Sequence, residues 1–148
     1  MLHSDFMSEA LILAKSAEKY GDVPVGAVIV KEDKIIAKGQ NKREKDKNSL
    51  LHAEIVAIDE ACKTLESKYL TGCTLYVTLE PCPMCAGAII NSRIDRVIFG
   101  AYDDKAGCFG TLTDFNGLSF NHKPEIIGGN MERDCSRVLR DFFEKKRK

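Results

Sequence analysis

The chain has 148 residues, of which 44% are hydrophobic, and this size and composition predict one globular domain spanning residues 1–148. Basic and acidic side chains number 22 each, so the formal net charge is zero and no overall positive field marks a nucleic-acid binder. The sequence has no basic leader and no apolar run of the roughly 18 residues that a membrane span needs. We therefore expect a cytoplasmic protein that is neither secreted nor inserted into a membrane.

The cysteines indicate a reducing compartment. Six are present, at positions 62, 73, 82, 85, 108 and 135. Only Cys82 and Cys85 are close enough in sequence to bind one metal ion together. The other four are scattered singly, which is not the pattern of a small disulfide-stabilised domain.

The first 40 residues predict a helix followed by a β-hairpin. Apolar positions between residues 6 and 17 recur at helical spacing. Two runs of β-branched and apolar residues, joined by a turn, predict a hairpin over residues 24–40. Gly26 interrupts its first strand, where a bulge or close packing is a more frequent reason than an approaching ligand.

A charged loop, residues 41–51, leads to a helix that is predicted from about His52 to Leu65. His52 and Glu54 stand two residues apart at its start, which on an ideal helix is about 200° of rotation. Their side chains can therefore converge only at the end of the helix. A metal ion beyond the N-terminus satisfies this geometry, because His52 can reach the ion while Glu54 reaches a water molecule beside it.

Residues 74–79 give the strongest strand signal, and a further helix is predicted after Pro81. Cys82 and Cys85, three positions apart, share a face of that helix. Both lie in its first turn, where the partial positive charge of the helix terminus favours thiolate over thiol. Two helix starts that face each other across one ion are a compact way to build a metal site.

The rest of the chain predicts two more strands and a last helix. The strands cover residues 96–101 and 125–127, and the helix begins after Asn130. Its basic tail, residues 145–148, is a candidate phosphate-binding strip, with a solvated C-terminus as the equally weighted alternative. The element order, α-β-β-α-β-α-β-β-α, indicates an α/β fold.

The ligand types indicate zinc. A histidine and a Cys-x-x-Cys pair suit Zn²⁺, and three such ligands leave its fourth tetrahedral position open for water. His-x-Glu followed by Pro-Cys-x-x-Cys is the established signature of zinc nucleobase deaminases. In that chemistry zinc holds the hydroxide that attacks the base, while Glu54 takes the water proton and returns protons to the ring nitrogen and the leaving amine.

Two other metal or cysteine sites are weaker interpretations. A structural zinc site would need a fourth cysteine or histidine near the first three, and no remaining candidate has motif spacing. A redox-active Cys-x-x-Cys pair would leave His52 and Glu54 without an explanation.

Nearly the whole sequence resembles the bacterial tRNA-specific adenosine deaminases, which convert the wobble adenosine of a tRNA anticodon to inosine. The resembling segments are residues 23–28, Asn41, and residues 52–55, 75–88, 92–94, 99–101 and 141–143. The His-Ala-Glu and Pro-Cys-x-x-Cys segments belong to the wider cytidine deaminase-like superfamily and specify the chemistry. The substrate is indicated by residues 103–107, which resemble the family's Asp-x-Lys-x-Gly loop. Residues 48–51 are Asn-Ser-Leu-Leu, where family members often have Asp-Pro-Thr-Ala.

The resemblance implies a catalytic zinc centre. It assigns one Zn²⁺ per subunit to His52, Cys82 and Cys85, and it assigns the proton shuttle to Glu54.

The resemblance also implies how substrate is bound. Asn41 would hydrogen-bond the flipped base, and the backbone N–H of Ala53 would meet the polar edge of the purine. Asp103 and Lys105 would touch the nucleotide and its neighbours, and Val28 belongs to the same implied set of substrate-binding residues.

At the level of the fold, the resemblance implies a three-layer α-β-α arrangement of the cytidine deaminase-like type, with a central five-stranded mixed sheet. It further implies a homodimer that binds a tRNA anticodon stem-loop. Two alternatives remain: a deaminase of free guanine, cytosine or a nucleoside, and a non-catalytic zinc module or RNA-binding relative. The loop at residues 103–107 disfavours the first alternative, and the presence of Glu54 disfavours the second.

Overall fold

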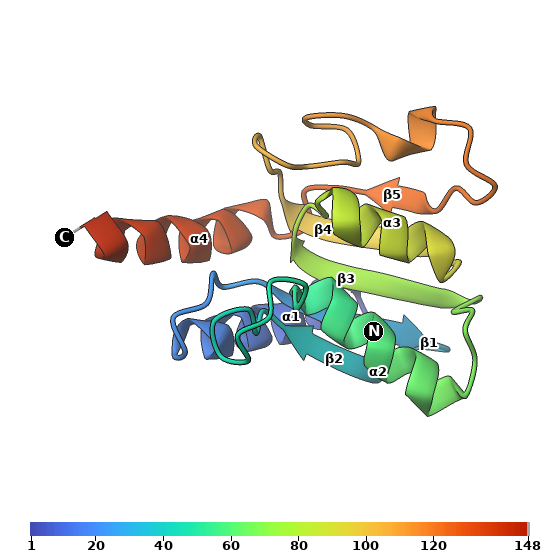
Figure 1. The fold of residues 1–148 in the computed structure, drawn as a ribbon, viewed down its shortest axis with the longest axis horizontal. Coiled ribbons are helices and arrows are strands. Elements are labelled where there is room, and N and C mark those ends of the chain that lie inside the picture. The colour runs from blue at the N-terminus through green and yellow to red at the C-terminus, as the bar shows by residue number, and fades with distance from the viewer. Residues whose placement is uncertain (148) are drawn as a thin grey trace.

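A computed structural model describes residues 1–147 as four α-helices packed on a five-stranded sheet (Figure 1). In chain order the elements are α1 (His3–Glu18), β1 (Gly26–Lys31), β2 (Lys34–Gln40), α2 (Ala53–Leu65), β3 (Cys73–Leu79), α3 (Pro83–Asn91), β4 (Arg96–Ala101), the 3-10 turn η1 (Phe115–Gly117), β5 (Glu125–Ile127) and α4 (Glu132–Arg147). The end of the basic tail, Lys148 and the side chain of Arg147, lies outside the described residues.

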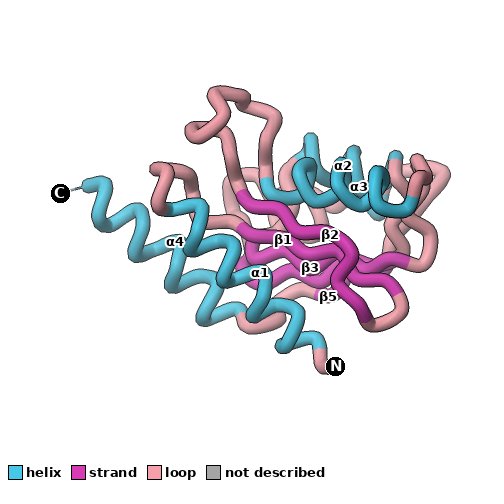
Figure 2. Tube along the Cα trace, turned by 90° about the horizontal axis from the view of Figure 1, so that it is seen from below, coloured by secondary structure: helices cyan, strands magenta, loops and turns pink. Residues whose placement is uncertain are grey.

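The sheet is mixed, with the strand order β2-β1-β3-β4-β5. Strand β1 runs antiparallel to both β2 and β3, whereas β3, β4 and β5 are parallel to one another. Helices α1 and α4 cover one face of the sheet, and α2 and α3 cover the other (Figure 2). The expected three-layer α/β fold with a five-stranded mixed sheet is therefore confirmed.

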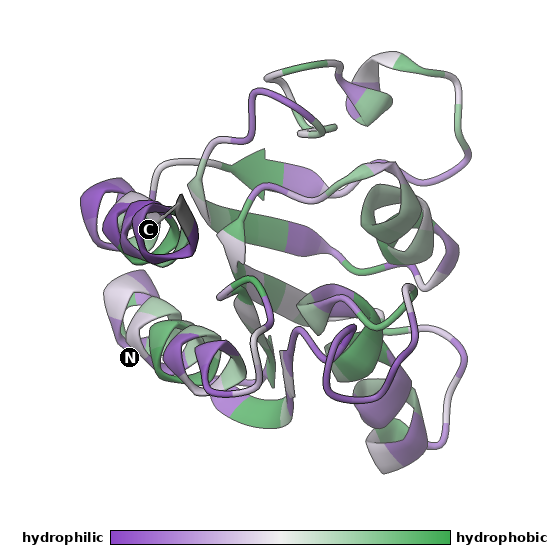
Figure 3. Ribbon diagram, turned by 60° about the vertical axis from the view of Figure 1, so that its left-hand side comes forward, coloured by the Kyte–Doolittle hydropathy of each residue, from purple (hydrophilic) through white to green (hydrophobic). Residues whose placement is uncertain are grey.

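Two apolar cores form because successive strand residues face opposite sides of the sheet. On β1, Ala27 and Ile29 belong to the core beneath α2 and α3, whereas Val28 and Val30 belong to the core beneath α1. Hydrophobic residues concentrate on the sheet and on the helix faces that meet it (Figure 3). Within residues 1–147, no helix combines the length and the apolar character that crossing a bilayer requires.

Two strand glycines allow helices to approach the sheet closely. A Cβ atom at Gly26 would overlap the carbonyl oxygen of Ala10 in α1, and one at Gly39 would overlap the carbonyl oxygen of Ala53 in α2. Gly26 thus serves helix packing, the more frequent of the explanations considered for it. Gly39 seats the first turn of α2 directly on β2, and this turn carries the candidate site residues.

Candidate active site

Two helix starts carry the candidate metal ligands. His52 is the N-cap residue of α2 and Cys82 is the N-cap residue of α3, both with extended backbone. Cys85 lies in the first turn of α3. Pro83 suits the first position of that helix, because the N–H that proline lacks would have no partner there. His52 and Glu54 therefore lie together at the start of α2, and Cys82 and Cys85 at the start of α3, as their spacing predicts.

The three ligand atoms are spaced as a tetrahedral zinc site requires. His52 Nδ1 lies 3.5 Å from Cys82 Sγ and 3.5 Å from Cys85 Sγ, and all three atoms lie within 4.8 Å of one another. Zn–S bonds of about 2.3 Å and Zn–N bonds of about 2.0 Å at tetrahedral angles place S and N about 3.5 Å apart. Among the described residues this is the one such group of histidine, cysteine or acidic side chains. The donor set fits Zn²⁺ with three protein ligands.

The protein itself prepares the cysteine pair for a cation. A hydrogen bond from Cys85 is the largest cause that lowers the pKa of Cys82, to about 4, so Cys82 is a thiolate at neutral pH. The same hydrogen bond and then burial raise the pKa of Cys85, and the bond to Cys82 raises the pKa of His52. Binding of Zn²⁺ therefore displaces a proton from Cys85, as expected for thiolate ligation.

Glu54 lies beside these ligands and is 4% exposed. Burial is the largest cause that raises the pKa of its carboxyl to about 7, and the charge of His52 acts in the opposite direction. A carboxyl group that titrates near neutral pH can both accept and return a proton. A proton shuttle needs this property.

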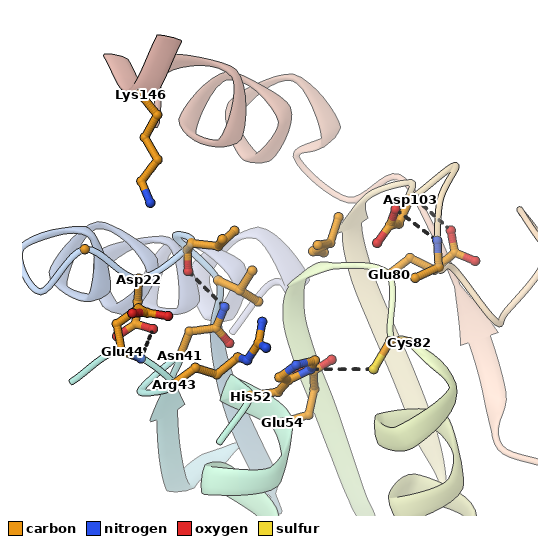
Figure 4. A pocket seen from close by; sticks show the side chains of 15 residues that line it. Asp22, Asn41, Arg43, Glu44, His52, Glu54, Glu80, Cys82, Asp103 and Lys146 are labelled. Carbon is orange, nitrogen blue, oxygen red and sulfur yellow. Dashed lines mark hydrogen bonds between the residues drawn. The ribbon is translucent and has the colours of Figure 1, made fainter. Parts of the chain in front are cut away.

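Two of the ligands, His52 and Cys82, border a pocket of about 240 Å³ together with Glu54. Its lining comes from residues 21–25, 41–54, 79–82 and 103–106, and Lys146 of α4 extends toward it (Figure 4). Concave sites with a few polar groups and some apolar wall are the usual form of small-ligand pockets.

Asn41 joins two sides of this pocket. Its Nδ2 donates to the carbonyl of Val23 at 2.9 Å, and its Oδ1 accepts from the backbone N–H of Ala53 at 2.9 Å. One Nδ2 hydrogen is left for a ligand. The N–H of Ala53 is already used within the protein, so its predicted contact with a purine requires Asn41 and the base to share this donor.

The loop after β4 supplies the opposite wall. Asp103 lines the pocket, and its Oδ1 accepts from the backbone N–H groups of Lys105 and Ala106 at 3.0 and 3.3 Å. Lys105 itself is exposed and is not part of the lining. The predicted contact of Asp103 is therefore geometrically open, whereas Lys105 could reach only a ligand that extends beyond the pocket.

The structure does not bring Val28, an expected substrate-binding residue, to the pocket. Val28 is fully buried in the core beneath α1, on the face of the sheet that is turned away from the pocket. The apolar lining from this segment is Val23 and Val25. Because strand side chains alternate between faces, a residue three positions after Val25 must point to the other side.

Two buried carboxylates of the lining were not predicted. Asp22 is 2% exposed and accepts from the N–H groups of Glu44 and Lys45 at 2.8 and 3.3 Å, which holds the charged loop. Glu80 is also 2% exposed and stands directly before the Pro81-Cys82 segment. That position within a chemistry-bearing motif was a usable signal for Glu80, whereas Asp22 had none.

Comparison with known proteins agrees with this geometry. A family model described as the cytidine and deoxycytidylate deaminase zinc-binding region matches residues 1–101. The tRNA-specific adenosine deaminase of Bacillus subtilis (strain 168) is 51% identical over 144 residues, which cover 97% of this chain and 89% of that protein. The protein of the same name from Aquifex aeolicus is 48% identical, over 96% of this chain and 94% of its own.

Solved structures extend the comparison. One from biochemical and structural studies of A-to-I editing by tRNA:A34 deaminases matches with a TM-score of 0.88 at 38% identity, covering 93% of this chain and all of that chain. The guanine deaminase of Bacillus subtilis matches with a TM-score of 0.67 at 33% identity, covering 82% and 88%. Matches at this identity and coverage, together with the His-Cys-Cys site, show that the chain belongs to the tRNA-specific adenosine deaminase family and carries the zinc-binding region of cytidine and deoxycytidylate deaminases.

Proposed function

We propose that this protein hydrolytically deaminates the wobble adenosine of a tRNA anticodon loop to inosine and releases ammonia. The observation that carries the proposal is the site itself: three zinc-type ligands at tetrahedral spacing beside a buried glutamate, in a chain about half identical to tRNA-specific adenosine deaminases. Water adds to C6 of the purine, and the amino group leaves, so the atoms balance as adenosine plus water to inosine plus ammonia.

Zn²⁺, when bound by His52, Cys82 and Cys85, supplies an acidified water as the nucleophile, but two thiolates weaken that acidification relative to a three-histidine site. Glu54 is therefore needed to take the water proton. Its pKa of about 7 allows the same carboxyl to give that proton to the ring nitrogen and to carry a second proton to the departing amine.

The walls of the pocket suit one extruded base. Asn41 has one free amide hydrogen for a purine acceptor, and Val25 and Leu79 provide apolar surface in the lining. An enzyme that acts on a loop nucleotide needs this combination, because the base leaves its stack and must be held by edge hydrogen bonds and apolar contact. The predicted contacts of Asp103 and Lys105 with the nucleotide and its neighbours belong to this proposal.

Because the chain as a whole has no net charge, attraction for the phosphates of the anticodon stem-loop must come from basic side chains near the pocket. Lys146 and Arg43 both border the pocket, from α4 and from the charged loop. Nζ of Lys145 lies 4.0 Å from Oε2 of Glu18, and the Lys145 side chain is mostly exposed. The position of Lys146 at the pocket supports the interpretation of the basic tail as a phosphate-binding strip.

Three finer features belong to the proposal: one Zn²⁺ per subunit, a homodimer, and a cytoplasmic location. Zinc analysis of purified protein against subunit concentration tests the first, and sedimentation equilibrium tests the second. A zinc-to-subunit ratio near one half would place the ion between two subunits and contradict the first.

The decisive experiment offers the zinc-loaded protein a synthetic anticodon stem-loop with adenosine at the wobble position. Inosine is measured in the stem-loop, and ammonia release is measured from free guanine, cytosine and their nucleosides. Inosine in the stem-loop alone supports the proposal. Ammonia from guanine alone would show that the protein is a guanine deaminase, like its structural relative from Bacillus subtilis. The basic tail would then be an ordinary solvated terminus.

A further inference from the structure

Glu80 is a buried carboxylate whose hydrogen-bonding capacity is fully used by one loop. Its Oε1 accepts from the backbone N–H of Asp103 at 3.1 Å and from the hydroxyl of Thr111. Its Oε2 accepts from the backbone N–H groups of Phe109 and Thr111 at 3.0 and 3.2 Å. A buried carboxylate is costly unless it is hydrogen-bonded, and these four donors match what an ionised carboxylate accepts.

The loop that supplies these donors, residues 103–111, is seated on the turn that also carries the metal ligand Cys82. The backbone N–H of Cys108 donates a hydrogen bond to the carbonyl oxygen of Pro81 at 2.9 Å and so joins the loop to this turn. A Cβ atom at Gly107 would overlap Cδ of Glu80, so only glycine permits the loop to close this tightly over the carboxylate. Asp103 and Ala106 of this loop line the active-site pocket.

We propose that Glu80 is the positioning residue of the substrate wall: it holds residues 103–111 so that Asp103 faces the pocket before the nucleotide arrives. The inference rests on the proposed function, because it assigns the held wall to the bound nucleotide. Both oxygens of Glu80 already accept hydrogen bonds from the loop, so Glu80 acts through this wall and not by hydrogen-bonding the substrate. A wall that is ordered in advance removes the entropic penalty of ordering it on binding, which strengthens substrate binding more than it changes the chemical step.

The substitution Glu80→Gln distinguishes the roles of the two carboxylate oxygens, because it replaces one of them with an NH₂ group. If the amide nitrogen takes the place of Oε2, it meets two backbone N–H groups, neither of which can accept a hydrogen bond. If it takes the place of Oε1, the hydroxyl of Thr111 can turn and accept, and only the N–H of Asp103 loses its partner. The second orientation is favoured, so Glu80→Gln releases Asp103 while residues 109–111 stay anchored.

The test uses zinc-loaded protein and the anticodon stem-loop. For Glu80→Gln we expect KM for the stem-loop to rise about tenfold with kcat within about twofold, as for loss of one charge-assisted hydrogen bond in a binding wall. Zinc content stays unchanged, and the amide of Asp103 exchanges with deuterium about tenfold or more faster. Asp114→Asn is the matched control, because this exposed carboxylate of the same connection accepts only from Asn116 N–H and is outside the pocket lining.

The single variant Thr111→Val keeps a test available if Glu80→Gln is too unstable to assay, and the double variant adds a second test where Glu80→Gln folds. Thr111→Val removes one hydroxyl donor and leaves every backbone hydrogen bond to Glu80 in place, so alone it should raise KM only about twofold to threefold. Combined with Glu80→Gln it removes the group that can accept from the amide. The double variant should therefore raise KM by more than the product of the two single effects.

Two results would overturn the inference. One is an unchanged KM with a lowered kcat in Glu80→Gln, which would make Glu80 part of the chemical step. The other is unchanged deuterium exchange at Asp103, which would show that Glu80 does not hold this wall. The exchange measurement needs no substrate, so it decides the anchoring even if the wild-type protein forms no inosine and the proposed function fails.

Discussion

The substitution Glu54→Gln tests the central carboxyl through stability as well as activity. Glu54 is 4% exposed, and burial raises its pKa from 4.5 to about 7. A glutamine at this position would keep the shape of the side chain but remove its charge and its ability to accept and return a proton. The zinc-loaded variant should therefore lose at least about a hundredfold in inosine formation, in line with the usual contribution of a general acid–base group.

The stability effect has a defined sign and pH window. Between pH 4.5 and about 7 the folded protein binds more protons at Glu54 than the unfolded chain does, so the contribution of Glu54 to the stability of the metal-free protein falls as pH rises through this window. Each tenfold change in acidity corresponds to about 1.4 kcal/mol, so the penalty above pH 7 is up to about 3 kcal/mol. Glu54→Gln removes this penalty and should stabilise the metal-free protein progressively from pH 5 to pH 8.

The assay is urea unfolding of wild type and Glu54→Gln with a zinc chelator at pH 5, 6, 7 and 8. The difference between the two proteins should be about 1 kcal/mol at pH 5 and approach about 3 kcal/mol at pH 8. A difference that does not vary with pH would refute the assignment of a raised pKa to this carboxyl. An active Glu54→Gln variant would refute its role in proton transfer.

Three further substitutions test the ligands, the packing and the charge of the site. Cys85→Ser should abolish stable zinc binding by metal analysis, whereas Cys62→Ser, outside the ligand group, should retain zinc. Gly39→Ala should destabilise the protein by about 2 kcal/mol or more in urea unfolding, because its Cβ would overlap a carbonyl oxygen of α2. Gly87→Ala, which meets no atom within 4 Å in α3, should be neutral or stabilising by about 0.5–1 kcal/mol, and equal losses at both glycines would contradict the packing argument. Lys146→Gln should raise KM for the stem-loop at low salt and reduce its logarithmic salt dependence by about one, whereas an unchanged salt dependence would remove this lysine from the RNA contacts.

Local sequence patterns were sufficient to predict the elements and the residues of the His52-Cys82-Cys85 cluster. The strands at residues 96–101 and 125–127 have the predicted bounds, and α2 begins at Ala53 with His52 as its cap. His52 and Glu54 could be placed at a helix end because two residues on an ideal helix diverge by about 200°. These inferences depend only on spacing within one element and on the chemistry of the side chains.

Sequence patterns were least informative where a residue's role depends on another part of the chain. Val28 was assigned to the substrate although its strand position turns it toward α1. The N–H of Ala53, which was expected to meet the base, also donates to Oδ1 of Asn41, which lies 12 positions earlier. Neither relationship can be recognised from residue types alone, because each is created by the pairing and packing of separate elements.

Residue types and their spacing indicate which chemistry is available: a histidine, two cysteines and a glutamate at helix starts, in an α/β chain of one family. How these residues meet, and what surrounds them, depends on the folded chain. It brings His52 within 3.5 Å of cysteines 30 and 33 positions away, and it wraps residues 103–111 around the buried Glu80. The physical reason is that burial and hydrogen-bond satisfaction depend on the whole packed chain, so a carboxylate becomes a proton shuttle or an anchor only once its neighbours are in place.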